Sequence, residues 1–225
     1  MPKKGLAARI NIMRASVMGA NDGVLSVAGI VVGVAGATAN KYAIFLAGIA
    51  GMLAGTVSMA MGEYVSVNAQ KDSQKRAAIQ QKEALAFNYE KEFDYVKQQY
   101  LEKGISERLA KQAVRELMGK DALATTVRAR FGFNINEMTS PYAAALASMI
   151  SFPLGSVLPL GVISFFPNQI RVLATFLAVV LTLGVTGYSA AVLGKANWKK
   201  GILRNLISGI LTMAATYLIG TCIGG

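Results

Sequence analysis

The sequence predicts an all-α membrane protein with five transmembrane helices and a small cytosolic helical domain inserted between the second and third helices. Charged residues make up 16% of the 225 residues, against about 25% in a typical soluble domain. The apolar residues collect in five stretches, each long enough to cross a bilayer core of about 20 helical residues. These stretches are residues 15–38, 42–65, 141–165, 169–193 and 201–223.

The distribution of Lys and Arg orients these spans in the membrane. Of the 23 basic residues, 21 fall on one side of the membrane, and only Lys41 and Arg171 fall on the other. The short loops alone give eight against two. Cytosolic loops carry the excess of positive charge, so we expect a cytosolic N-terminus and an extracytosolic C-terminus. The net charge of +11 then reflects topology and contact with the lipid bilayer, and it does not indicate a nucleic-acid partner.

The residue content also narrows the chemistry. The chain has no His and one Cys, Cys222, which excludes an intrachain disulfide and a His/Cys zinc cage built from one chain. We find no nucleophile–base pair and no phosphate-binding loop, so we do not expect an enzyme. The first span is too long for a cleaved signal peptide. The lack of a targeting extension favours a prokaryotic cytoplasmic membrane, or a vacuolar membrane if the chain is eukaryotic.

The domain boundaries follow the charge pattern. Residues 1–66 hold the first two spans, residues 67–138 form the cytosolic domain, and residues 139–225 hold the last three spans. The middle segment contains ten of the twelve acidic residues and has a helical period. It is expected to be continuous with the second span.

Helix signals divide this cytosolic domain. We expect a break near Asn88, a helix that stops at Gly104, a further helix capped by Ser106, and a last short helix through "DALATTVRAR". Two apolar stripes are predicted to face the core of the domain. They are Phe93, Val96 and Tyr100 in the first of these helices, and Leu109, Ala113 and Leu117 in the next.

Glycine and proline mark the packing of the membrane helices. Gly29 and Gly33, like Gly51 and Gly55, have the four-residue spacing that lets helices approach closely. We interpret them as packing residues. The third span also carries Pro153 and Pro159, which predict a kink at membrane depth.

Two acids lie inside the predicted spans, Asp22 in the first and Glu63 in the second. Each is eight residues from the nearest flanking cation, Arg14 or Lys71, which is about 12 Å along a helix. In an antiparallel hairpin the two acids therefore lie at similar depth, and neither has an obvious basic partner. A carboxylate at this depth has to be protonated, solvated in a cavity or bound to a cation.

Met59 stands one turn from Glu63 on the same helix face. Carboxylates alone suit Mg²⁺, Ca²⁺ and Mn²⁺, whereas a thioether favours later transition metals. Asp22, Met59 and Glu63 are therefore our candidate ligands for a weak, transient Fe²⁺ or Mn²⁺ site. The alternative is that Met59 only packs and that Glu63 is an interfacial residue at a helix end.

Two stretches resemble one known family. "MGANDGVLSVAGIVVGVAGA" and "GIAGMLAGTVSMAMGEYVSVNAQKD" are similar to the first two spans of the vacuolar iron transporter family. The resemblance implies five spans, a homodimer with a metal pathway between its protomers, and proton-coupled export of Fe²⁺ or Mn²⁺ from the cytosol. It makes Asp22 and Met59 pathway ligands and adds Asn21 and Gly23 to the first motif, with Glu63 in a Gly-Glu-Tyr motif.

The cytosolic domain departs from that family. Members often carry Glu-x-x-Glu pairs there, where they collect metal. Here one pair reads Glu92 and Tyr95, and the upstream pair falls near Gln81 and Ala84. Glu116 is retained. Glu92 and Glu116 are thus secondary candidates for metal binding, and we expect the domain to have lost most of a metal cluster while keeping its helical shape.

Together these observations predict a homodimeric antiporter that moves Fe²⁺ and/or Mn²⁺ out of the cytosol in exchange for protons. The metal is a transported substrate, and we expect no permanently bound cofactor. Two alternatives stay open. One is a carrier of another divalent cation, such as Co²⁺ or Ni²⁺, and the other is a non-transporting membrane scaffold whose basic domain docks a partner or anionic lipid.

Overall fold

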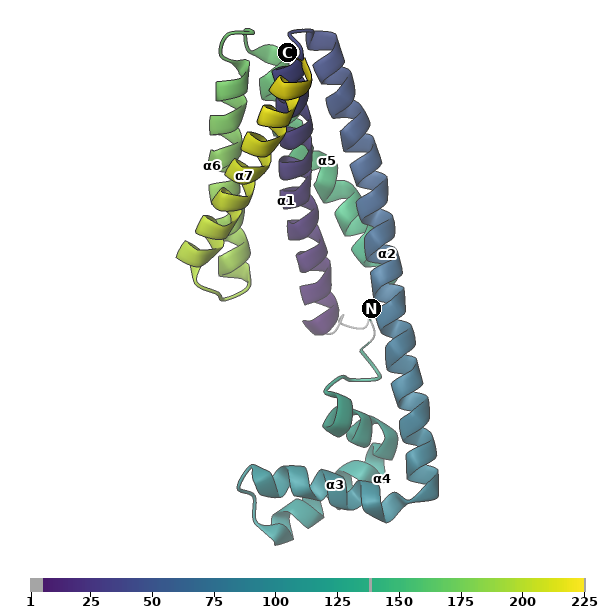
Figure 1. The fold of residues 1–225 in the computed structure, drawn as a ribbon. Helices are drawn as coiled ribbons and strands as arrows, with labels where there is room; N and C mark the ends of the chain where they lie inside the picture. The colour runs from purple at the N-terminus through teal and green to yellow at the C-terminus, as the bar shows by residue number, and fades with distance from the viewer. Residues whose placement is uncertain (1–5, 138, 225) are drawn as a thin grey trace. The chain divides into compact units, whose positions relative to one another are not determined.

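The computed structural model describes residues 6–137 and 139–224, which form helices joined by short loops. The helices are α1 (Leu6–Ala37), α2 (Lys41–Phe87), α3 (Tyr89–Glu102), α4 (Glu107–Phe131), α5 (Pro141–Phe165), α6 (Arg171–Leu193) and α7 (Trp198–Gly224). Figure 1 shows their arrangement. The chain divides into two compact units, a membrane unit of Ile10–Val65 and Pro141–Gly225 and a polar unit built mainly from Ser66–Ser140.

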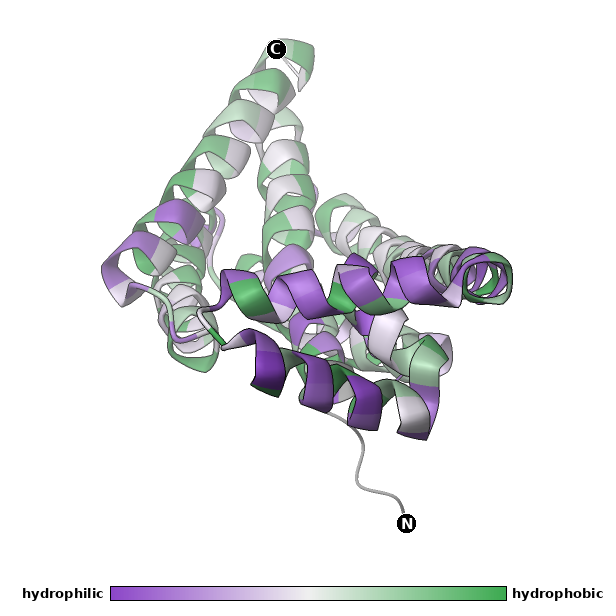
Figure 2. Ribbon diagram, turned by 90° about the horizontal axis from the view of Figure 1, so that it is seen from below, coloured by the Kyte–Doolittle hydropathy of each residue, from purple (hydrophilic) through white to green (hydrophobic). Residues whose placement is uncertain are grey.

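The five predicted spans are confirmed as helices. Within the described residues, α1, α2, α5, α6 and α7 are the five that are long and apolar enough to cross a membrane. The loops between them are short, since three residues separate α1 from α2 and five separate α5 from α6. The second span does continue into the polar segment, because α2 is one helix of 47 residues. Figure 2 shows apolar residues along the membrane helices and hydrophilic residues along α3 and α4.

The membrane helices alternate in direction. A Cβ added at Gly19 would meet Ser148 of α5, and one at Gly33 would meet Thr216 of α7. The later residues Gly23 and Gly36 meet correspondingly later residues of the same two helices, so α1, α5 and α7 run in parallel. Because the connecting loops are short, α2 and α6 run the other way. The membrane unit therefore begins on one face and ends on the opposite face (Figure 1).

The core of the membrane unit lies around the second half of α1. Val24, Val27 and Val31 are fully buried there, and they pack with residues from every other membrane helix. The partners include Ile44, Phe152, Leu183 and Met213. The outward residues of α5, α6 and α7 are large and apolar, for example Leu154, Leu181 and Leu211, as expected for helix faces that contact lipid.

Glycine allows the tightest helix contacts. A Cβ on Gly155 of α5 would overlap the carbonyl of Ala20 on α1, and a Cβ on Gly220 of α7 would overlap the carbonyl of Gly33. Small residues at such contacts let helix backbones approach closely. The interpretation of the two glycine pairs as packing residues is confirmed. Gly29 and Gly33 face threonines of α7, and Gly51 and Gly55 face Ile30 and Phe152.

Arg171 forms hydrogen bonds with both the α1–α2 loop and the α5–α6 loop on one face of the membrane unit. Its side chain is buried and donates to the carbonyl oxygens of Thr38 (3.2 Å) and Ala39 (3.4 Å), just after the end of α1. It also donates to Asn168 in the α5–α6 loop (3.1 Å). A cation at a helix C-terminus is favoured by the helix dipole. This contact also brings Arg171 to the face that holds Lys41.

The polar unit follows the predicted helix signals. Asn88 separates α2 from α3, and its side-chain oxygen accepts a hydrogen bond from the Lys91 backbone amide (3.1 Å). Gly104 has φ +83°, a conformation that suits glycine. The last short helix is also present, because Asp121 adopts an extended backbone inside α4. Its carboxylate caps the new start by accepting from the Ala124 amide (2.8 Å).

The predicted core stripe of α4 is wrong by one residue. Leu109 and Leu117 are 51% and 41% exposed, whereas Ala110, Val114 and Met118 are buried. Both sets have a four-residue spacing, so the period alone does not distinguish them. Val114 and Met118 of this buried set pack against Val96 of α3, as predicted for that side of the core.

We predict that Gly155→Ala destabilises the membrane unit. The new methyl group would overlap the Ala20 carbonyl, and overpacking of this kind costs about 1–3 kcal/mol. The matched control is Gly161→Ala on the same helix, where a Cβ meets nothing within 4 Å. Thermal unfolding in detergent, followed by size-exclusion chromatography, should show a lower transition temperature for Gly155→Ala only. Equal stability of the two variants would contradict the close α1–α5 contact.

Candidate metal site

The glycines of "GANDG" seat α1 against α5. A Cβ at Gly19 would collide with the Ser151 hydroxyl, and one at Gly23 would collide with the Phe152 carbonyl. The Ser156 hydroxyl donates to the Gly23 carbonyl oxygen across the same contact (3.2 Å). The Gly-x-x-x-Gly spacing therefore has a packing role, and the two polar residues between the glycines point to other faces of α1.

Asn21 joins α1 to α6 and α7. Its side-chain oxygen accepts a hydrogen bond from the Asn205 amide (3.0 Å) and one from the Thr186 hydroxyl (3.3 Å). A metal ion would need that same oxygen, because the amide nitrogen of Asn has no free lone pair for it. Asn21, a secondary candidate for metal binding, is therefore engaged in helix packing in this structure.

The carboxylate of Asp22 has a different environment. Asp22 is partly exposed, and within residues 6–137 and 139–224 no hydrogen bond or ion pair reaches it. Apolar core residues follow it directly on α1, beginning with Val24 and Val27. An acid in such a helix is costly unless it faces a cavity or a cation, so Asp22 keeps its place as the leading candidate ligand.

Glu63, by contrast, has a basic partner, and the expectation that neither span acid has one is wrong here. Arg14 Nη2 lies 2.9 Å from Glu63 Oε2. The Glu63 side chain is 7% exposed and that of Arg14 is 49% exposed. Arg14 directly precedes the first apolar stretch, residues 15–38. Its long side chain reaches the Glu63 carboxylate while the guanidinium stays half exposed to solvent, as is common for arginine.

The register of the α1–α2 hairpin relates these residues. A Cβ at Gly51 would touch Ile30, and the same antiparallel register leads to the Arg14–Glu63 pair. Asp22 and Met59 lie between these two contacts on their respective helices, so they stand at about the same level. Met59 is partly buried against the apolar core, which fits both a packing residue and a ligand.

The donor atoms of one chain do not make a complete metal site. Among the described residues, no three His, Cys, Asp or Glu side chains converge in a way that could hold a metal ion. Asp22, Glu63 and Met59 can supply two carboxylates and one thioether. The remaining ligands of a metal ion would have to be water, backbone carbonyls or groups from a second chain.

The polar unit holds its own buried carboxylate, Glu92. Arg130 donates to both of its oxygens, from Nε (2.7 Å) and from Nη2 (2.8 Å). Gln81 donates to one of them as well (2.6 Å), and the Arg130 guanidinium lies over the Tyr95 ring at 3.9 Å. Tyr95 falls at one position, and Gln81 near another, where the family resemblance implies glutamates. Glu92 is thus neutralised inside the chain, and its oxygens are not free for a metal ion.

The charge of Arg130 also controls the titration of this cluster. The hydrogen bonds from Arg130 hold the pKa of Glu92 below its usual value of 4.5, against the opposing effect of burial. Reciprocally, Glu92 raises the pKa of Arg130. A lowered pKa means that the carboxylate stabilises the fold above pH 4.5 and loses this effect as the pH falls through the folded-state pKa.

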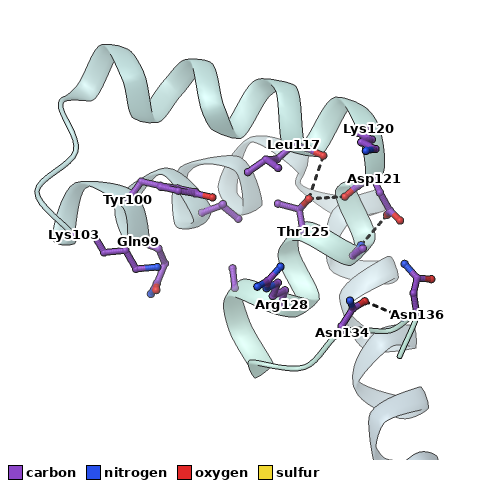
Figure 3. Close-up of a pocket in the computed structure, with 13 residues that line it drawn as sticks. Gln99, Tyr100, Lys103, Leu117, Lys120, Asp121, Thr125, Arg128, Asn134 and Asn136 are labelled. Carbon is purple, nitrogen blue, oxygen red and sulfur yellow. Dashed lines mark hydrogen bonds between the residues drawn. The ribbon is translucent and has the colours of Figure 1, made fainter. Parts of the chain in front are cut away.

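The polar unit contains a basic cavity. It has a volume of about 590 Å³, and Figure 3 shows Lys103, Lys120 and Arg128 around it. Asp121 also lines it, but that carboxylate caps a helix. Glu116 lies elsewhere on α4, where it is exposed and accepts a hydrogen bond from Gln112 (3.0 Å). This cavity therefore repels a divalent cation, and neither Glu92 nor Glu116 changes that.

Comparisons with known proteins agree with this architecture. A sequence profile of the VIT family matches residues 13–221. The chain belongs to the VIT family. It is 32% identical to the vacuolar iron transporter of Acanthamoeba castellanii, over 92% of this chain and 77% of that protein. It is 36% identical to vacuolar iron transporter homolog 1 of Oryza sativa (93% and 73%) and 33% identical to homolog 3 of Arabidopsis thaliana (96% and 85%).

Family membership and the five apolar helices make this chain an integral membrane protein. They also confirm the resemblance on which part of the site prediction rests. Sequence reasoning missed Arg14 as the partner of Glu63, because it used Arg14 only as the flanking cation of Asp22 and Lys71 as the flanking cation of Glu63. The hairpin register was the signal that could have revealed this pair. It also missed Gly19 and Gly23 as a packing pair, although their spacing is the same as in the pairs that were recognised.

We predict that Arg130→Ala loosens the polar unit of this VIT-family protein. Removing Arg130, whose side chain is 29% exposed, leaves the buried Glu92 carboxylate without its cation, at a cost of roughly 3 kcal/mol, the low end of the range for a fully buried pair. Hydrogen–deuterium exchange of the full-length protein should show about a hundredfold faster exchange in α3 and α4. Because the pKa of Glu92 is held below 4.5, the difference from the unmodified protein should be constant above pH 4.5 and should shrink only as the pH falls below that value.

The control for this experiment is Arg128→Ala. Arg128 is also on α4 and close in sequence, but it is exposed at the rim of the cavity. It should leave the exchange rates of α3 and α4 unchanged. Similar effects of the two substitutions, or a difference that does not depend on pH, would show that the Glu92–Arg130 pair is not what holds these helices.

Proposed function

We propose that this chain transports a divalent transition metal, Fe²⁺ and/or Mn²⁺, out of the cytosol in exchange for protons. The observation that carries the proposal is the Asp22 carboxylate, which lies in a membrane helix with no cation or hydrogen-bond donor from the described residues. The relatives are named as vacuolar iron transporters and their homologues. These names support a metal ion as the substrate, and they favour Fe²⁺ over the other candidate metals.

The donor set is suited to a transported ion. Carboxylates bind hard divalent cations, and the Met59 thioether, at the level of Asp22, shifts the preference toward Fe²⁺ and away from Mg²⁺ and Ca²⁺. A site of few protein ligands binds weakly enough to release its ion. The carboxylates must be deprotonated to hold a metal, so protons arriving from the far side displace it, which accounts for antiport.

A homodimer would complete this site. One chain supplies fewer donors than a metal ion needs, since no cluster of three acidic, His or Cys side chains occurs among the described residues. A second copy placed along α1 and α2 would double the carboxylates and thioethers around a shared path. The role of the protein would then be iron and manganese homeostasis, with the two chains acting as one carrier.

Two other functions make different predictions for the same measurement. A carrier of Co²⁺ or Ni²⁺ would use the same ligands and would differ only in the metals that it moves. A non-transporting scaffold is supported by the basic cavity of the polar unit, lined by Lys103, Lys120 and Arg128, which could receive an anionic partner. The test is metal flux into sealed proteoliposomes with an imposed pH gradient, compared for Fe²⁺, Mn²⁺, Co²⁺, Zn²⁺ and Ca²⁺. The metals that are moved distinguish the two carriers, and a scaffold moves none of them.

The direction of transport rests on the topology, which we predict to be N-terminus in the cytosol and C-terminus outside it. The cation asymmetry of 21 to 2 supports this orientation. Alkaline phosphatase fused after Gly225, which lies outside the described residues, should be active because it folds only outside the cytosol. The same enzyme inserted in the α6–α7 loop at Lys195 should be inactive. The reverse pattern would invert the proposed direction.

We predict that Asp22→Asn abolishes metal transport without unfolding the protein. The amide keeps the size of the side chain, but it binds a divalent cation poorly and does not titrate. Flux in proteoliposomes should fall to background for every metal, while size-exclusion profiles and thermal stability stay close to those of the unmodified protein. Asp22→Glu should be partly active, with altered metal preference, because the charge is kept but moves by one methylene.

Glu116→Gln is the matched control for the loss of one acid. Glu116 is exposed and accepts a bond from Gln112, and its substitution should leave the flux near normal. Normal transport by a well-folded Asp22→Asn protein would falsify the assignment of Asp22 and would put the scaffold function first.

A further inference from the structure

Among the described residues, two arginine–glutamate pairs are built in opposite ways. In the Glu92 pair, Arg130 contacts both carboxylate oxygens, Gln81 adds a third donor, and the guanidinium lies on an aromatic ring. In the Glu63 pair, a single contact joins Arg14 Nη2 to Glu63 Oε2. Among the described residues nothing donates to Glu63 Oε1. The first pair is a permanent structural contact, and the second leaves half of its carboxylate unoccupied.

Exposure separates the two partners of the Glu63 pair. The Glu63 side chain is 7% exposed, so its ionised form needs a counter-cation. The Arg14 side chain is 49% exposed, so its charge is largely hydrated whether or not it touches Glu63. The carboxylate therefore depends on a cation much more than the arginine depends on the carboxylate.

Arg14 also has other contacts and room to move. Its Nε and Nη2 donate to Asn11 on the same helix (3.2 and 3.0 Å), and its Nη1 approaches the Met18 sulfur (3.7 Å). Beside it lies a groove of about 370 Å³ between α1, the end of α6 and the start of α7, lined by Arg14, Met18 and Arg204 among others. The guanidinium can turn toward this groove while its bonds to Asn11 keep it on α1.

We propose that Arg14 is the resting counter-cation of Glu63 and that an entering divalent metal displaces it. This inference rests on the proposed transport function. The metal binds the free Oε1 first and then takes Oε2, and the guanidinium swings away because two cations repel each other at that distance. When the metal moves on toward the level of Asp22 and Met59, Arg14 returns to Glu63. Arg14 thus lowers the affinity of the entrance for metal and prevents Glu63 from trapping it.

The first test is the affinity of the purified full-length protein for Mn²⁺, measured by titration calorimetry at constant pH. Arg14→Gln removes the competing charge, so Mn²⁺ should bind more tightly, on the order of tenfold. Arg14→Lys keeps the charge and should stay within about twofold of the unmodified protein. The double variant Arg14→Gln with Glu63→Gln should lose the gain. Arg204→Gln, a cation of the same groove that does not touch Glu63, is the matched control.

The second test needs no variant and applies even if Arg14→Gln fails to fold. Phenylglyoxal modifies accessible arginine side chains, and mass spectrometry measures the extent at each position. Saturating Mn²⁺ should increase the modification of Arg14 several-fold and leave Arg204 unchanged. Unchanged or weaker Mn²⁺ binding by a folded Arg14→Gln protein, or unchanged reactivity of Arg14, would overturn the proposal. If metal flux is nevertheless observed, the transport function stands, whereas absence of both binding and flux removes both.

Discussion

A carboxylate that is shielded from water has to be neutralised, because the charged form is far less stable in an apolar environment. Much of this structure can be understood from how three acids meet that requirement. Glu92 is held by an arginine and a glutamine of its own unit. Glu63 has one arginine contact from the neighbouring helix, and no partner from the described residues reaches Asp22. The dependence on an external cation increases in the same order.

The order of increasing dependence on an external cation agrees with the function that we propose for each unit. In the polar unit the buried carboxylate of Glu92 is paired within the unit, its pKa is lowered, and a cavity of the same unit is lined by basic side chains, so neither feature favours a bound metal ion. In the membrane unit, the tight glycine contacts fix α1 against α5 and α7. These contacts set which face of α1 carries Asp22.

The sequence was sufficient to predict the helices, because the length and apolarity of each span leave few alternatives. The caps at Asn88 and Gly104 were equally clear from local chemistry. The contacts between helices were harder. The buried stripe of α4 could not be chosen from two sets with the same period, and the partner of Glu63 depended on the hairpin register and on the reach of one arginine side chain. The engagement of Asn21 with Asn205 depends on residues 184 positions apart, and local patterns do not encode such distances.

The alternation of the membrane helices has a further consequence for symmetry. Many secondary carriers consist of two repeats of equal size and inverted orientation, and they expose their site to each side by rocking one repeat against the other. The five membrane helices described here cannot be divided into two equal sets of whole helices. In the proposed homodimer, a two-fold relation between moving parts would relate one chain to the other. The two-fold axis that relates the moving parts would then lie in the interface between the two chains, and each chain would supply one half of that interface.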